Sequence, residues 1–199
     1  MDIINVPFTG YYDGHRKFHV GFTKGITTLI GKNGCGKTSM VRELEYWLKK
    51  ENIPVYLYIQ DDKGKDVHHS GFNGGSFAAT SVYHCASEGE RIIVTCGYML
   101  SDIKRFIQKH TELGHDKIFV LFDGLDSGLS IDNIIQVREV FDLLIKDYPN
   151  LYIVNTANNY EMLKDTRCVH AKTGRDVKIK TYSGFVKFIA KAKAIAVHT

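Results

Sequence analysis

The chain has 199 residues, of which 44% are hydrophobic and 24% charged, and its formal net charge is +4. This composition is typical of a globular protein and predicts one domain over residues 1–199 around a single buried core. The positive charge is small and mixed with acidic residues, so composition alone favours a solvated surface and does not indicate a nucleic-acid partner. No apolar run approaches the ~20 residues of a spanning helix, the start lacks a signal-peptide layout, and the four cysteines form no ligand pattern. We therefore expect a soluble cytoplasmic protein with reduced thiols and no membrane partner.

Strand and helix patterns alternate through the first part of the chain. A short apolar strand begins at Gly25 and leads through a glycine loop into a helix. One face of this helix is apolar and carries Met40, Val41, Leu44, Trp47 and Leu48. Pro54 precedes a second strand, residues 55–59, which is rich in β-branched and aromatic residues. Residues 61–86 lose this periodicity and are rich in Gly and Ser, which predicts a short irregular insertion.

The alternation continues to the end of the chain. A long helical region follows Ser87, and an apolar strand occupies residues 118–123. Ser130 is the expected cap of a helix. The apolar residues of that helix are Ile131, Ile134, Ile135, Val140, Phe141, Leu144 and Ile145. A buried strand LYIVN, a strand over residues 177–182 and a basic helix from Gly184 complete an α/β fold, a mostly parallel sheet flanked by helices.

One motif carries a specific chemistry. Gly31, Gly36, Lys37 and Thr38 match GxxxxGKT, which follows a predicted strand and opens a helix. In such a loop the glycines allow successive backbone N–H groups to converge on phosphate oxygens, and the helix adds the positive end of its dipole. Lys37 is expected to reach the β- and γ-phosphates, and the Thr38 hydroxyl to coordinate Mg²⁺. The predicted contacts to ATP come from Gly31, Lys32, Asn33, Gly34, Cys35, Gly36, Lys37, Thr38 and Ser39.

The motif requires an acidic partner for the metal. Asp123 ends the apolar strand of residues 118–123, and the end of a neighbouring buried strand is where such a carboxylate holds Mg²⁺ through its water shell. The sequence therefore predicts ATP and Mg²⁺ as cofactors of a P-loop NTPase.

These motifs, the SEGER segment and the string FDGLDSGLS together resemble the ABC-type ATPase superfamily, in particular its soluble branch of RecF, structural-maintenance-of-chromosomes and DNA-repair ATPases. The resemblance covers roughly residues 1–178 and implies a homodimer in which Ser87 and Gly89 contact the ATP held by the partner subunit. It also implies that Ser127–Ser130 cross the dimer interface and that Gln60 senses the γ-phosphate and the metal. Tyr12, or its neighbour Tyr11, is similar in placement to an adenine-stacking aromatic. The coiled coil of the DNA-tethering relatives is missing.

Two positions depart from the family pattern. Gly124 stands where the family has its catalytic glutamate, and Asn158 where it has a histidine. Asp126 is the nearest acidic residue and is a candidate base or a brace. Since the loss of a positioned base lowers a rate by roughly 10² to 10⁴-fold, we expect slow hydrolysis. If the rest of the site is intact, Gly124→Glu is expected to raise turnover.

Three functions fit the sequence. The first is a slow ATP hydrolase that acts as a dimerising nucleotide switch in DNA or RNA transactions, with a nucleic acid or a separate protein as its partner. Its candidate nucleic-acid contacts are Lys178, Lys180, Lys187, Lys191 and Lys193. The second is a regulatory module that binds ATP without hydrolysing it. The third is a P-loop small-molecule kinase. Such enzymes normally close an arginine-bearing lid over the phosphate, and the absence of arginine from residues 61–86 argues against this function.

Overall fold

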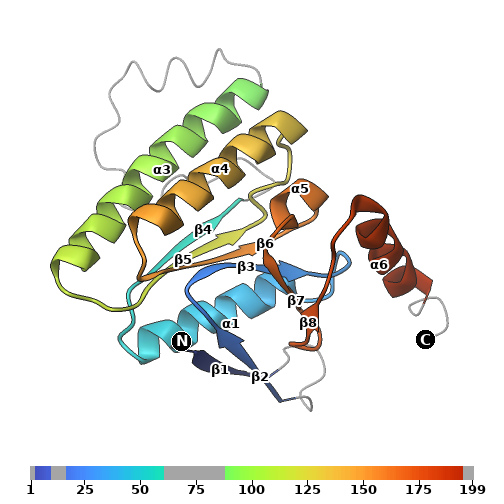
Figure 1. Cartoon of the computed structure of the whole chain (residues 1–199), viewed down its shortest axis with the longest axis horizontal. Coiled ribbons are helices and arrows are strands. Elements are labelled where there is room, and N and C mark those ends of the chain that lie inside the picture. The colour runs from blue at the N-terminus through green and yellow to red at the C-terminus, as the bar shows by residue number, and fades with distance from the viewer. Residues whose placement is uncertain (1–2, 10–16, 61–87, 195–199) are drawn as a thin grey trace.

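A sheet of six strands forms the middle layer of the protein (Figure 1). The computed structural model describes residues 3–9, 17–60 and 88–194. The strand order across the sheet is β4 (Val55–Ile59), β5 (Ile118–Asp123), β6 (Leu151–Thr156), β3 (Gly25–Ile30), β7 (Arg167–His170) and β8 (Asp176–Val177). The pairs from β4 to β7 are parallel, and β8 is antiparallel to β7. The predicted α/β fold with a mostly parallel sheet is confirmed.

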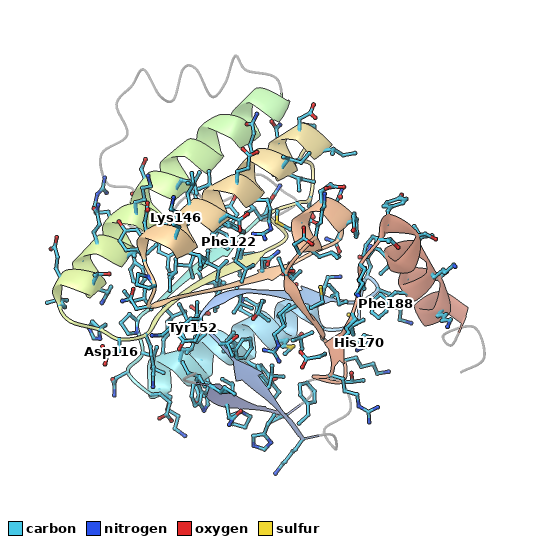
Figure 2. The ribbon with its side chains drawn as sticks, in the orientation of Figure 1. Asp116, Phe122, Lys146, Tyr152, His170 and Phe188 are labelled. Atoms are coloured by element: carbon cyan, nitrogen blue, oxygen red, sulfur yellow. The ribbon has the colours of Figure 1, made fainter. Side chains whose placement is uncertain are left out.

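The central strands are apolar because both faces of the sheet are covered. Every residue of β5 and of β6 is buried. Side chains alternate between the two faces, so Phe119, Leu121 and Tyr152 pack on one side, while Phe122 and Ile153 pack on the other. Figure 2 shows Tyr152 and Phe122 on these opposite sides. This alternation decides on which face the polar residues at the strand ends lie.

One face is covered by α1 (Lys37–Lys50) together with a small antiparallel sheet, β1 (Ile4–Phe8) and β2 (Phe18–Phe22). The helix contributes the buried residues Met40, Val41, Leu44 and Leu48, as its helical spacing predicts. Arg167 of β7 donates to the carbonyl oxygen of Gly21 in β2 and also pairs with Asp176. The small sheet is therefore attached to the large one by packing and by a side chain from β7.

The opposite face is covered by α3 (Glu88–Glu112) and α4 (Ile131–Asp147) (Figure 1). Ile103 and Ile107 of α3 and Phe141 of α4 are completely buried there. Ser130 caps α4, since its hydroxyl oxygen accepts from the backbone N–H of Asn133 at 3.4 Å, as predicted. Ile131 of α4 is 58% exposed, so the apolar face expected from the sequence is only partly buried.

The last part of the chain differs most from the sequence prediction. The strand expected over residues 177–182 is wrong: β8 ends at Val177, and α6 (Tyr182–Ala194) begins at Tyr182. The short helix α5 (Tyr160–Leu163) and the strand β7 were not predicted. Helix α6 packs through Phe185 and Phe188, and the ring of Phe188 lies 5.6 Å from that of His170 (Figure 2).

Two further expectations from the sequence concern membrane-spanning helices and the insertion of residues 61–86. Within the described ranges, no helix is long and apolar enough to cross a membrane. The predicted insertion of residues 61–86 lies outside the described residues.

Candidate phosphate-binding site

Loops from four parallel strands meet at one edge of the sheet. The carboxyl ends of β3, β4, β5 and β6 lie at this edge because the strands are parallel, and such an edge is where ligands bind in open α/β sheets. The register pairs Leu29 with Thr156 and Ile59 with Asp123. The segment Gly31–Ser39, Gln60, Asp123 and the residues after Thr156 therefore belong to one side of the molecule.

The order of the strands corrects one detail of the sequence prediction. Asp123 was expected at the end of a strand next to the glycine loop. In the structure β5 is not hydrogen-bonded to β3, because β6 lies between them. A metal bound by both Asp123 and Thr38 would therefore lie over the end of β6. The last residues of β6 would then be close to it.

The glycine loop depends on backbone angles that favour glycine. Gly31 has φ 153°, Gly34 φ 76° and Gly36 φ 97°. A Cβ atom on Gly31 would lie only 2.4 Å from the Sγ of Cys35, which closes over the loop from the other side. Burial raises the pKa of this thiol, and the charge of Lys37 acts in the opposite direction. The loop is thus a tight turn with a neutral thiol packed inside it.

The loop ends in an open helix N-terminus. Gly36 is the N-cap of α1, has a left-handed conformation and provides no side-chain cap, and the first turn of α1 contains no acidic residue. The first N–H groups of a helix have no partner inside the helix, and a capping side chain commonly satisfies them. Without such a cap these N–H groups, together with the helix dipole, suit a bound phosphate.

Lys37 and Thr38 occupy the first turn of α1. The Lys37 Nζ atom donates to the carbonyl oxygen of Gly31 at 3.0 Å, so the side chain curls back over the loop. The side chain of Thr38 is exposed. A phosphate that binds in the loop therefore meets a lysine amine at its rim and a hydroxyl at the start of the helix.

Asp123 lies on the same face of the sheet as α1, because the odd-numbered residues of β5 point to that face. Its carboxylate is buried, and Oδ1 accepts a hydrogen bond of 3.0 Å from the Thr156 hydroxyl. The same hydroxyl oxygen accepts from the backbone N–H of Gly124 at 2.9 Å. Thr156 was not predicted as a site residue from the sequence. The signal that could have identified it is a threonine at the end of a buried strand, on the same face of the sheet as Asp123.

Asp126 ties the loop after β5 to the loop after β6. Its Oδ2 atom accepts from the backbone N–H groups of Asn158 at 2.6 Å and Asn159 at 2.7 Å, and its Oδ1 atom from the Asn158 side chain at 3.4 Å. Burial raises the pKa of the Asp126 carboxyl, while these backbone donors and, more weakly, the charge of Lys37 act in the opposite direction. The Asp126 carboxylate thus connects the two loops through its hydrogen bonds with Asn158 and Asn159, as a brace would.

Gln60 lies at the far side of the site. It follows β4, which is separated from β3 by β5 and β6. Its backbone N–H donates to the Asp123 carbonyl at 2.9 Å, and its side-chain Nε2 donates to the carbonyl oxygen of Ser127. The structure thus places Gln60 against Ser127, the first residue of the segment Ser127–Ser130, and beside Asp123.

Other residues expected at the site are only partly described. Gly89 lies in the first turn of α3, so the SEGER segment does begin a helix. Ser87, Tyr11 and Tyr12 lie outside the described residues. The contacts proposed for these residues stay predictions.

The donor set fits a magnesium ion. Mg²⁺ prefers oxygen ligands, retains several waters and is usually held by one or two carboxylates together with substrate phosphates. Asp123 supplies a carboxylate and Thr38 a hydroxyl. In the part of the chain that the structure describes, no group of three or more His, Cys, Asp or Glu side chains is arranged to hold a metal ion. These residues therefore suit a metal that has few protein ligands and is otherwise bound by water and phosphate oxygens.

The fold and the site thus combine a mostly parallel sheet with a glycine loop that joins β3 to α1. No protein-family model and no curated protein matches the sequence. The chain is similar to a solved structure described as a metal-chelate type ABC transporter in an inward-facing conformation. The two are 14% identical, the match covers 94% of this chain and 86% of that one, and the TM-score is 0.48. A likeness this remote assigns no family, and membership of the ABC-type superfamily stays a prediction.

Proposed function

We propose that this protein binds ATP with Mg²⁺ between the glycine loop Gly31–Ser39 and Asp123, and that it is an ABC-type nucleotide switch. The observation that carries the proposal is the loop itself, a glycine-rich turn that ends in an uncapped helix N-terminus with Lys37 at its rim. Asp123 supports it, because its carboxylate is buried on the same face of the sheet as α1. Lys37 balances the phosphate charge, and Thr38 and Asp123 hold the metal.

The switch that we propose is a homodimer closed around ATP, in which Ser87 and Gly89 of one subunit contact the nucleotide of the other. This part rests on the resemblance of the sequence to the soluble ABC-type ATPases. We place its client among nucleic acids or nucleic-acid-bound proteins. Among the lysines that the sequence suggests for such contacts, Lys178, Lys180, Lys187 and Lys191 are exposed.

A second candidate function is a regulatory module that binds ATP without hydrolysing it. Hydrolysis requires a proton acceptor within hydrogen-bond reach of the attacking water. Gly124 has no side chain, and the Asp126 carboxylate already accepts three hydrogen bonds from Asn158 and Asn159. These observations favour slow or absent turnover, whereas the glycine loop fits the kinase alternative equally and does not separate it from the other two.

Lys37→Ala is expected to weaken ATP binding by about 10- to 100-fold, because charge-assisted hydrogen bonds to phosphate contribute about 1.5–3 kcal/mol. Calorimetry with ATP and Mg²⁺ measures this loss, and gel filtration with the same ligands detects the dimer, which the variant is expected not to form. Lys24→Ala is the matched control, since Lys24 is an exposed lysine next to β3 at the other edge of the sheet. The proposed function would be wrong if the wild type released no heat with millimolar ATP, or if both variants bound equally well.

The backbone at Gly124 changes the expectation for Gly124→Glu. Its φ is 74°, and a Cβ atom there would point toward Gln60, with the Gln60 carbonyl oxygen at 3.7 Å. The Ser127 Oγ atom would lie at 3.9 Å, so a glutamate at this position begins against Gln60 and Ser127. We expect Gly124→Glu and Gly124→Ala to lose a similar ~1–2 kcal/mol of unfolding free energy through the left-handed backbone.

Phosphate release by these two variants tests the direction of the side chain. We expect the glutamate variant to hydrolyse ATP no faster than the alanine variant. A rate about 10²-fold higher in the glutamate variant would contradict this geometry, because it would show that a carboxylate at position 124 reaches the attacking water.

A further inference from the structure

The last residue of β6 lies between the two halves of the proposed ATP site. Thr156 is paired with Leu29 of β3 on one side, and its hydroxyl contacts Asp123 of β5 on the other. Its side chain is 1% exposed. The even-numbered residues Tyr152 and Val154 of β6 pack with α1, so Thr156 points to the face on which the glycine loop and Asp123 lie.

The Thr156 hydroxyl acts here both as a hydrogen-bond donor and as an acceptor. It has one proton, which it donates to Asp123 Oδ1 at 3.0 Å, and its oxygen accepts from the Gly124 N–H at 2.9 Å. The first bond fixes the rotation of the Asp123 carboxylate, and the second fixes the backbone that follows Asp123. One buried side chain therefore orients the carboxylate and also the turn to Ser127, whose N–H donates to the Gly124 carbonyl at 2.9 Å.

We infer that Thr156 is the positioning residue of the metal site, and this inference rests on the proposed binding of ATP with Mg²⁺. Thr156 holds one oxygen of Asp123 so that the carboxylate presents a fixed orientation to the metal and its waters. Groups that hydrogen-bond to a metal ligand orient that ligand, and their removal typically lowers metal affinity by about 10- to 100-fold. The role that we assign to Thr156 is to orient this ligand and not to bind the metal or the nucleotide itself.

A threonine and a valine differ here only in the hydroxyl. Valine preserves the branched shape at the end of β6 but leaves both the Asp123 oxygen and the Gly124 N–H without this partner. The end of β3, from which the glycine loop starts, is held by backbone bonds that the substitution retains, because the Leu29 and Ile30 carbonyls accept from the N–H groups of Ala157 and Ala171. Loss of the hydroxyl is therefore expected to disturb the metal while the phosphate-binding amides stay in place.

The test is ATP affinity measured by calorimetry, once with Mg²⁺ and once with EDTA, in wild type and in Thr156→Val. We expect the valine variant to bind metal-free ATP within about twofold of wild type. The increase in ATP affinity that Mg²⁺ causes is expected to be about tenfold smaller in the variant than in wild type. Electron paramagnetic resonance of Mn²⁺ added with ATP gives a direct second readout, in which the fraction of bound Mn²⁺ falls in the variant. Thr156→Ser retains the hydroxyl and is expected to behave as wild type in both measurements.

A matched control separates this role from a general loss of stability. Thr28 is a completely buried threonine on the opposite face of the sheet, where its hydroxyl contacts Asn155 and Thr166. Thr28→Val also removes a buried hydroxyl and is expected to leave the effect of Mg²⁺ on ATP binding unchanged. If Thr156→Val does not fold, Thr156→Cys replaces it, because a thiol is a weaker hydrogen-bond donor and acceptor than a hydroxyl, and an intermediate loss of Mn²⁺ binding is expected.

The outcomes distinguish this inference from the proposed function. If wild type binds ATP neither with Mg²⁺ nor with EDTA, the proposed function is wrong. If wild type binds ATP and Mg²⁺ tightens the binding equally in wild type and Thr156→Val, the function stands and the role of Thr156 is wrong. An equal loss of the Mg²⁺ effect in Thr28→Val and Thr156→Val also overturns that role.

Discussion

Gly31→Ala is expected to lose about 100-fold or more in affinity for ATP with Mg²⁺, which corresponds to about 2.7 kcal/mol. Gly31 is buried at the start of the loop with φ 153°, an angle that residues with a side chain rarely adopt, and an added Cβ would lie 2.4 Å from the Sγ of Cys35. The collision displaces the Cys35 side chain or the loop, and the unfavourable φ displaces the loop, so we expect its N–H groups no longer to converge on the phosphates. Calorimetric titration with ATP measures the loss.

Two companion variants assign the cause of this loss. Gly34→Ala introduces a side chain at φ 76° where an added Cβ meets nothing within 4 Å, so it reports backbone strain without a collision and is expected to lose less affinity. Adding Cys35→Ala to Gly31→Ala removes the sulfur and is expected to restore part of the affinity. If Gly31→Ala binds ATP within about threefold of wild type, the loop does not hold the phosphates in the way that we propose.

Asp126→Ala is expected to lower the free energy of unfolding by about 2–4 kcal/mol, because each hydrogen bond to a charged group contributes about 1.5–3 kcal/mol. The carboxylate is 6% exposed and joins the loop after β5 to the loop after β6 through Asn158 and Asn159. Alanine leaves both backbone N–H groups without this acceptor, although Asn158 is exposed and water replaces part of what is lost. Denaturant unfolding of the full chain measures the change.

Asp126→Asn separates a brace from a base. Asparagine keeps one oxygen for the two backbone donors and removes the charge whose burial raises the pKa of the carboxyl. A raised folded-state pKa means that folding favours the protonated form, a contribution that is complete below the ordinary pKa and is lost as pH rises through the folded-state pKa. The neutral asparagine therefore avoids that penalty at pH 7, and we expect its stability to lie much closer to wild type than that of Asp126→Ala.

Turnover of Asp126→Asn completes this comparison. A brace keeps its function in the amide form, so the rate of phosphate release is expected to stay within a few-fold of wild type. A general base loses its function in that form, and a fall of about 10² to 10⁴-fold would show that Asp126 accepts the proton.

The arrangement of Gly124, Asp126 and Thr156 supports our proposal that ATP hydrolysis is slow or absent. Two of the three residues position Asp123 and its flanking turn through hydrogen bonds. The third, Gly124, has a left-handed backbone, and a Cβ atom there would lie beside Gln60 and Ser127. In our proposal this segment orients a metal ligand, and we expect none of these three residues to act as the proton acceptor.

Local sequence patterns were sufficient for much of the fold. The strand that begins at Gly25, the turn at Gly31–Gly36 and the helix that follows are each specified by residues close together in the chain: an apolar run, glycines at positive φ, and helical spacing of apolar residues. The same holds for β5 and β6, whose continuous apolar runs indicate strands that are buried on both faces. Interactions between residues a few positions apart determine these features.

Where residues far apart in sequence meet, only the tertiary structure decides. The strand expected over residues 177–182 ends at Val177, and a helix begins at Tyr182, where Phe185 and Phe188 of that helix pack against Tyr160 and His170. The short strand β7 is defined by its pairing with β3, a contact between distant parts of the chain. Short elements have little local preference, so the partner available in the folded protein determines their structure.

The candidate site divides in the same way. The sequence by itself determined the glycine loop, Lys37, Thr38 and Asp123, because each of them belongs to a pattern of neighbouring residues. The insertion of β6 between β3 and β5, the hydrogen bonds of Thr156 and the direction of a side chain at Gly124 required the folded structure. These features depend on strand order and on backbone angles, which are fixed by the packing of the whole sheet and not by any short segment of the chain.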